Sequence, residues 1–200
     1  MYEIDSRIKF KAATELVEPP VIIRVNDFDE KTAKDFAEQM NKAHNTKQPI
    51  IPIVIDSYGG QVYSLLSMIA EIKTSKIPVA TICMGKAMSC GGILLTFGAE
   101  GYRYIHEDST VMIHDVSSMH YGKNEELKAS ATQTDKLQKQ IFRMMAKNCK
   151  QPQDYFLDII HDKAHAEWYL DAKEAKKHKI VNHVKIPNFK INVDVSIDIE

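Results

Sequence analysis

Cysteine is scarce in this 200-residue chain, which has only three and no CxxC pair. Such an odd, sparse set indicates neither a disulfide framework nor a zinc site. Apolar runs are also short, and none approaches the roughly 18 residues that a membrane span needs. The first ten residues carry charges instead of the apolar core of a signal peptide. We therefore expect a protein of the reducing cytoplasm that has no membrane partner.

An excess of charge of one sign is missing too, because 26 Lys and Arg residues stand against 27 Asp and Glu residues. This balance gives no electrostatic reason to expect nucleic acid as a partner. The composition, 44% hydrophobic and 26% charged, is typical of a globular protein. No repeat, low-complexity stretch or linker divides the sequence, so we expect a single domain over residues 1–200. Nothing in the sequence indicates a cofactor or a metal site.

Apolar runs rich in β-formers alternate with segments of helical periodicity. This alternation is typical of an α/β fold with largely parallel strands that are covered on both faces. The expected strands are 21–24, 50–55, 77–84 and 109–116, and the expected helices between them are about 29–43, 61–75 and 91–99.

The second half of the chain begins with a stretch that lacks Gly and Pro, residues 124–150, and this predicts one long helix. Residues 170–184 are expected to form a helix that runs into a short strand. Both ends of the chain, 2–11 and 189–199, alternate apolar and polar residues as half-buried strands do. The two ends are therefore candidates to pair, within or between subunits. Packing positions in the long helix are expected at Leu127, Ala131, Leu137, Ile141, Met144 and Met145.

Residues 79–99, VATICMGKAMSCGGILLTFGA, lead from an apolar strand to a buried helix through very small residues. Ser89 lies at this junction. The start of a helix has unpaired N–H groups that favour negative charge. A hydroxyl there is placed to attack a carbonyl while the N–H of Cys90 binds the oxyanion. By the local pattern alone, a helix-capping serine is the commoner case, because the stretch is not a GxSxG motif.

Two further features complete the parts of an acyl-transfer site. The stretch IDSYGG ends a strand with Gly59 and Gly60, and STVMIHDV places His114 at the end of another strand. Ligands of open parallel sheets gather beyond the carboxyl ends of the strands, where all these residues would meet. Each feature alone is more often structural than catalytic. Together they are the nucleophile, base and backbone donors that acyl transfer requires.

These stretches resemble the signature segments of the ClpP family, the proteolytic subunits of Clp protease, which are serine peptidases. IDSYGG resembles the oxyanion-loop segment, GKAMSCGGILLTFGAEGYRY the nucleophile segment and STVMIHDV the histidine segment. Their order and spacing agree as well, and the likeness extends from about Val21 to Val184.

The resemblance implies a role for each matching position. Ser89 matches the nucleophile and His114 the general base, while the backbone N–H groups of Gly59 and Cys90 match the oxyanion hole. The position of the family's catalytic acid, usually Asp, aligns with Glu167. Glu167 can hold the imidazole tautomer, although its extra methylene shifts the carboxylate. Asp162 and Asp171 are the alternative candidates for the acid.

The resemblance also implies a ClpP/crotonase-type fold of repeated β-β-α units with a protruding handle helix, here about residues 124–150. In the family, the handle helices of the subunits join two seven-membered rings into a chamber. The chamber receives peptides or unfolded proteins from an AAA+ Clp ATPase. The core would span residues 21–184.

Three departures from the family pattern bear on peptide docking and on contact with the ATPase. Tyr58 replaces the usual Pro of the oxyanion loop, residues 1–20 form a shorter N-terminal segment, and residues 185–200 add a C-terminal strand. The N-terminal segment bears the family's contact with the ATPase, so its change puts that docking in question. A phage-type member is one source that fits these departures.

Four other interpretations stay open. One is a crotonase-type enzyme whose paired N–H groups polarise a thioester, and a second is a Ser–Lys peptidase that uses Lys86 as the base. A third takes Cys90 as the nucleophile. The fourth is a catalytically weak or inactive ring subunit that acts as a scaffold or modulator. The presence of both Ser89 and His114 disfavours the crotonase-type enzyme and the inactive subunit. Lys86 lies three residues before Ser89 in a turn, which does not ensure that it points the same way, and Cys90 is better explained as a small buried residue that presents its N–H.

Overall fold

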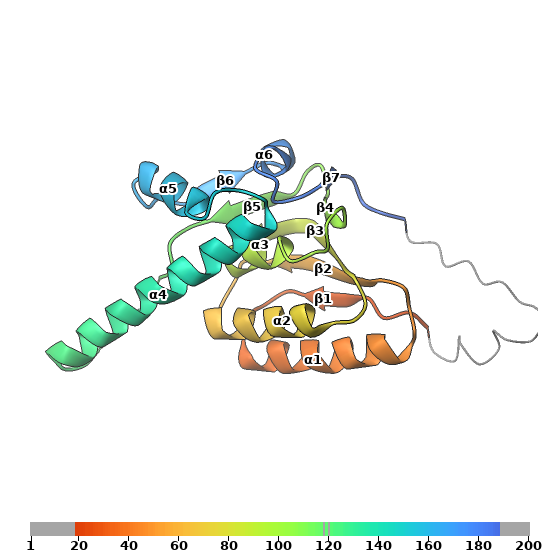
Figure 1. The fold of residues 1–200 in the computed structure, drawn as a ribbon, viewed down its shortest axis with the longest axis horizontal. Helices are drawn as coiled ribbons and strands as arrows, with labels where there is room; N and C mark the ends of the chain where they lie inside the picture. The colour runs from red at the N-terminus through yellow and green to blue at the C-terminus, as the bar shows by residue number, and fades with distance from the viewer. Residues whose placement is uncertain (1–18, 118, 120, 189–200) are drawn as a thin grey trace, which may run out of the picture.

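The computed structural model describes residues 19–117, 119 and 121–188. The terminal strands expected at 2–11 and 189–199 lie outside the described residues. Thirteen helices and strands follow one another along the described chain (Figure 1). In order they are β1 (Ile23–Val25), α1 (Glu30–Asn45), β2 (Ile51–Ser57), α2 (Val62–Thr74), β3 (Val79–Met88), α3 (Cys90–Leu95), β4 (Arg103–Ile105), β5 (Thr110–Ile113), α4 (Asn124–Asn148), α5 (Tyr155–Asp162), β6 (Trp168–Leu170), α6 (Ala172–Lys177) and β7 (His183–Val184).

The central strand of the sheet is β3, which is long enough to pair with three others. It lies parallel to β2 on one side, and on the other side it pairs first with β4 and then with β5. The pairing of β5 with β6 is antiparallel, whereas the other strand pairs of the described chain are parallel. The predicted α/β fold with a parallel-dominated sheet is therefore confirmed.

Two short strands were not anticipated as separate elements. Both β4 and β6 have three residues, too few to show a period in the sequence. The strand expected at 77–84 also continues to Met88, because β5 offers Lys86, Ala87 and Met88 a further parallel partner. That extension carries the chain directly to Ser89.

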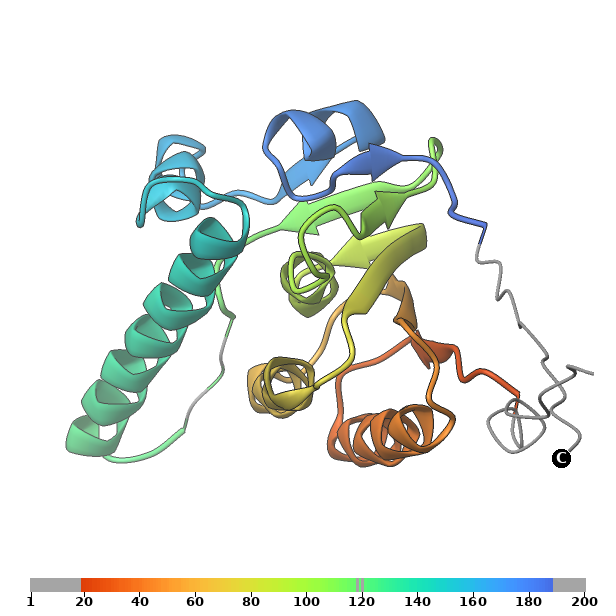
Figure 2. The ribbon, with the colours of Figure 1, turned by 45° about the vertical axis from the view of Figure 1, so that its right-hand side comes forward.

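The main core lies between the sheet and the helices α1, α2 and α3, which line one face of the sheet (Figure 2). Helix α1 begins at Asp29, whose carboxylate accepts a hydrogen bond from the Thr32 N–H, and this bond lowers the pKa of Asp29. Its residues Phe36, Met40 and Ala43 are buried at helical spacing. Helix α3 packs against β3 with all six of its residues buried. This packing holds the β3–α3 junction in a rigid frame.

Helix α4 extends away from this body, as Figure 1 shows. Its second half packs on the core through Leu137, Ile141 and Met145, which are buried, and Met144, which is partly buried. In its first half, Leu127 is 39% exposed and Ala131 is exposed too. The packing face predicted for this helix is thus correct only for the second half. No helix of the described chain is both long and apolar enough to cross a membrane.

Candidate active site

Ser89 occupies the single residue between β3 and α3. Its N–H donates to the carbonyl oxygen of Met112 in β5 over 2.8 Å, so the neighbouring strand fixes its position. Its backbone has φ 54° and ψ −119°, a combination that a residue with a Cβ atom rarely adopts. Sharp strand-to-helix turns of this kind expose a serine hydroxyl above the sheet. The backbone strain is therefore located at the residue whose hydroxyl the sequence singled out.

This strain predicts a stability difference between two variants that both lack the hydroxyl. Ser89→Gly should be more stable than Ser89→Ala by about 1 kcal/mol, because a positive φ is unfavourable for a residue with a Cβ atom. The difference is not larger because glycine also makes the unfolded chain more flexible, which lowers the free energy of unfolding. Urea unfolding of the two variants side by side measures the difference. An equal or lower midpoint for Ser89→Gly would show that the turn is not strained.

His114 follows β5 and reaches Ser89 directly. Its Nε2 lies 2.9 Å from the Ser89 Oγ. The sheet register explains the contact, because β3 and β5 are parallel with Met88 beside Met112, and both chains leave the sheet at the same edge. Two residues 25 positions apart are thereby brought within hydrogen-bond distance.

The turn Gly59–Gly60 lies against Ser89. A Cβ atom on Gly59 would lie 2.7 Å from the Ser89 Cβ, and φ of Gly59 is 105°, so only glycine fits this close approach. The N–H of Gly59 donates to the Ser57 Oγ over 3.0 Å, so it is already engaged. Among the hydrogen bonds of the described residues, none uses the N–H of Gly60. Gly59 as an oxyanion donor stays a prediction, and Gly60 is a neighbouring donor that sequence reasoning missed.

Cys90 begins α3, where its N–H has no partner within the helix. Its thiol donates to the carbonyl oxygen of Gly60 over 3.3 Å, which ties the glycine turn to the serine segment. Burial raises the pKa of the Cys90 thiol to about 11. Cys90 is therefore a protonated, structural thiol at neutral pH and is unsuited to act as the nucleophile.

Glu167, the predicted acid of the triad, lies in the segment before β6. The antiparallel register pairs Ile113 with Trp168, and its continuation by one residue places His114 opposite Glu167. Residues opposite one another in such a ladder have Cβ atoms about 5 Å apart. In this structure, however, the Glu167 carboxylate accepts a hydrogen bond of 2.6 Å from the Tyr169 hydroxyl. The bond raises the pKa of Tyr169. Tyr169 is a second residue that the sequence did not single out.

The alternative acids lie elsewhere. Asp171 caps α6, where its carboxylate accepts from the Glu174 N–H over 2.8 Å. By register it lies beyond the Leu170–Val111 pair, at the far end of β5 from His114. Asp162 is an exposed residue at the end of α5. None of the hydrogen bonds recorded for the described residues joins His114 to Glu167, Asp162 or Asp171, so the identity of the acid stays a prediction.

Lys86 does not lie beside Ser89 as a Ser–Lys pair would require. Its Nζ is 2.7 Å from Asp56 Oδ1 and 4.3 Å above the Tyr58 ring. The hydrogen bond to Asp56 raises the pKa of Lys86, which keeps the ammonium protonated. Lys86 is thus a poor base but a good support for Tyr58, the residue that replaces the family's usual Pro.

The segment that leaves His114 is anchored to α4. The Asp115 carboxylate accepts from Gln138 Nε2 over 2.9 Å and contacts His165 Nδ1 over 2.5 Å. Gln138 Oε1 also accepts from the Val116 N–H over 2.9 Å. These contacts join the segment after His114, helix α4 and the α5–β6 loop. No sequence pattern predicts them, because the residues come from three separate segments. Within the described ranges, no cluster of three or more His, Cys, Asp or Glu side chains could hold a metal ion.

Comparison with known proteins identifies a family. The chain matches the Clp protease family over residues 5–187. It belongs to that family. The ATP-dependent Clp protease proteolytic subunit of Deinococcus radiodurans is 32% identical over 135 residues, which are 67% of this chain and 64% of that relative. The match therefore spans less than two thirds of the relative's length.

Proposed function

We propose that this Clp protease family member is a serine endopeptidase that hydrolyses peptide bonds in extended or unfolded polypeptides. The observation that carries the proposal is the contact of 2.9 Å between Ser89 Oγ and His114 Nε2. A serine is a weak nucleophile unless an adjacent base takes its proton. The contact supplies that base, and the strained turn presents the hydroxyl at the edge of the sheet.

The reaction follows from the atoms in place. Ser89 Oγ attacks the carbonyl carbon of the substrate while its proton passes to His114 Nε2, and the carbonyl oxygen becomes an oxyanion. His114 then gives the proton to the leaving amine as the C–N bond breaks. Water, activated by the same imidazole, hydrolyses the Ser89 ester and releases the acid product.

The oxyanion requires donors that are already in position. The Cys90 N–H at the start of α3 and an N–H of the Gly59–Gly60 turn are the donors we propose. We assign the acid to Glu167, which a change of side-chain rotamer would move from Tyr169 to His114 across the β5–β6 register. There it would hold the imidazole tautomer and stabilise the imidazolium.

Assembly is part of the proposal. The free half of α4 has exposed Leu127 and no core of its own to cover, which is the arrangement expected of a handle that joins rings. We propose that the chain forms a homo-oligomeric chamber of stacked rings and that a Clp ATPase delivers its substrates. The relative from Deinococcus radiodurans is named as the proteolytic subunit of an ATP-dependent protease.

One observation favours a second candidate function. The Glu167 carboxylate is bonded to Tyr169 in this structure, so the third member of the triad is turned away from His114. A ring subunit of weak activity that supports a more active partner would have such a site.

Peptide hydrolysis by the assembled chain tests the proposal. We expect the purified protein to cleave unstructured fluorogenic peptides, and native mass spectrometry of the same sample should show a ring assembly. An assembled ring without hydrolysis would contradict the peptidase and favour the weak subunit. If the sample is monomeric and inactive, the assay is repeated under conditions that promote assembly before either function is judged.

A further inference from the structure

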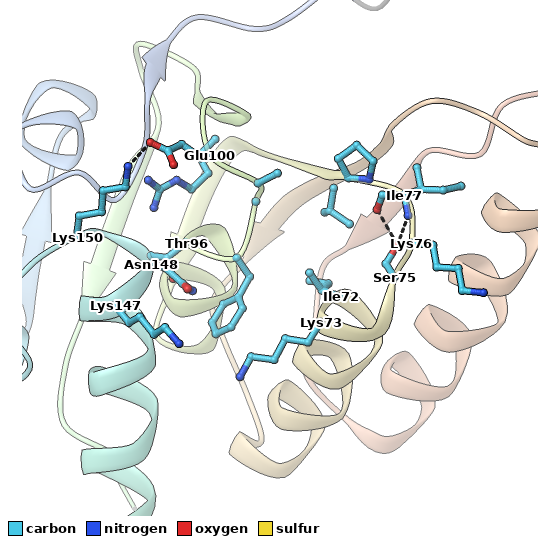
Figure 3. Close-up of a pocket in the computed structure, with 16 residues that line it drawn as sticks. Ile72, Lys73, Ser75, Lys76, Ile77, Thr96, Glu100, Lys147, Asn148 and Lys150 are labelled. Carbon is cyan, nitrogen blue, oxygen red and sulfur yellow. Dashed lines mark hydrogen bonds and ion pairs between the residues drawn. The ribbon is translucent and has the colours of Figure 1, made fainter.

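A pocket of about 640 Å³ lies at the opposite end of β3 from Ser89. Val79, the first residue of β3, lines the pocket, whereas Ser89 follows its last residue. A strand of ten residues spans about 30 Å, so the two sites are separate. The walls come from the end of α2, the loop before β3, the segment after α3 and the end of α4 (Figure 3).

The lining of the pocket is strongly cationic. Five of its residues are Lys or Arg, and Glu100 is the one carboxylate among its lining residues. The chain as a whole carries nearly equal numbers of basic and acidic residues, so this excess is a local feature. In Figure 3 the side chains of Lys73 and Lys147 extend from α2 and α4 into the space between the two helices.

Most of these cations have no carboxylate partner. Within the described part of the chain, Lys150 forms an ion pair with Glu100, but Lys73 contacts only the sulfur of Met144, at 3.3 Å, and the ring of Phe97, at 5.6 Å from its centroid. Lys147 has no recorded ion pair among the described residues.

Among the five basic residues of the pocket, Arg103 gives the strongest indication of an anionic ligand, because it is only 4% exposed. Its Nε donates to Asn182 Oδ1 over 3.2 Å, and its Nη1 lies 3.8 Å from Cys149 Sγ. Burial raises the pKa of the Cys149 thiol to about 11, so this sulfur carries no charge at neutral pH. A buried guanidinium normally has an anionic partner. No described residue forms an ion pair with Arg103, and the Glu100 carboxylate, whose pKa Arg103 helps to lower, is bonded to Lys150 instead.

The helix ends account for part of this charge but not for all of it. The C-termini of α2, α3 and α4 contribute residues to the pocket, and each such end carries about half a negative charge. Together they offset roughly 1.5 charges, against an excess of four cations over carboxylates, five less one. By this count the pocket keeps a net positive charge.

We propose that this pocket binds a small multivalent oxyanion whose charge is carried by phosphate groups. Arginine matches the geometry of phosphate oxygens, and lysines on flexible stems supply the remaining charge. The volume is in the range of pockets that hold small ligands. Glu100 competes with the ligand for Lys150 and sets the affinity.

Isothermal titration of the full chain with inorganic tripolyphosphate tests the site, with citrate as the carboxylate probe. Lys73→Gln combined with Lys147→Gln should weaken tripolyphosphate binding about tenfold, since two exposed charges are lost. Glu100→Gln should tighten binding, because it releases Lys150 and removes a negative charge. These opposite directions are what a localised site requires.

A matched control removes the same charge elsewhere. Lys173→Gln with Lys176→Gln changes two exposed lysines of α6, away from the pocket, and should leave the affinity within about twofold of the wild type. Circular dichroism of each variant checks the fold. A control that weakens binding as much as the pocket variant, or a wild-type protein that binds no tripolyphosphate, overturns the proposal. Equal affinity for citrate would overturn the assignment to phosphate.

Discussion

Wild-type protein treated with a phosphonofluoridate probe should gain the mass of one phosphonyl group, and Ser89→Ala should gain none. The probe reacts with a serine only when a neighbouring base activates it. His114 Nε2 is the base in contact with Ser89 Oγ. Any background labelling of other hydroxyls in Ser89→Ala should be at least about 10³-fold slower than labelling of the wild type, since the activated nucleophile is gone. Intact mass spectrometry provides the measurement.

A neighbouring serine serves as the control for this experiment. Ser117 is exposed and lies three residues after His114, and Ser117→Ala should label at the wild-type rate. A wild-type ring that takes no label would contradict an activated Ser89 and leave the weak ring subunit as the better description. Label retained by Ser89→Ala would place the nucleophile at another residue.

Glu167→Gln should lower the kcat/KM for peptide hydrolysis by about 10²- to 10⁴-fold if Glu167 is the acid. An amide in place of the carboxylate no longer stabilises the imidazolium and favours the wrong histidine tautomer. The register of β5 and β6, continued by one residue past the Ile113–Trp168 pair, would place Glu167 opposite His114, which is the physical reason for preferring it to the other two carboxylates. Hydrolysis of a fluorogenic peptide by equal amounts of assembled protein measures the effect.

Three further variants make this result specific. Asp162→Asn and Asp171→Asn remove the alternative acids, and each should retain activity near that of the wild type, although Asp171→Asn weakens the cap of α6. Tyr169→Phe removes the hydroxyl that now holds Glu167 and should not lower activity, since the carboxylate is then free to turn to His114. A large loss in Asp162→Asn or Asp171→Asn, with Glu167→Gln unaffected, would move the acid to that residue.

The structure excludes two of the interpretations that the sequence left open. Lys86 is bound to Asp56 and stacked on Tyr58, so it is not available as the base of a Ser–Lys pair in this conformation. Cys90 has a thiol whose pKa burial raises to about 11, which removes it as a thiolate nucleophile at neutral pH. A crotonase-type reaction would use the two backbone donors without the Ser89–His114 contact, and that contact is present.

Much of the fold could be predicted from the sequence because its signals are local. Buried strands 50–55 and 77–84 are continuous apolar runs, and α2 shows a helical stripe that the structure buries at Leu65, Ile69 and Ile72. The short strands β4 and β6 could not be predicted in the same way. Three residues carry no period, and their extended form comes from pairing with β3 and β5.

The sequence by itself determined where Ser89, His114 and the glycine turn would meet. Each follows a strand, and the carboxyl ends of parallel strands share one edge of the sheet. Only the tertiary structure decided which N–H of the turn is engaged, because that depends on the dihedral angles of Gly59 and Gly60 and on the Ser57 hydroxyl. It alone paired Glu167 with Tyr169 and gathered the cations of the basic pocket. Contacts of these kinds depend on strand register and on helix ends far apart in the chain, and no local pattern of residues specifies them.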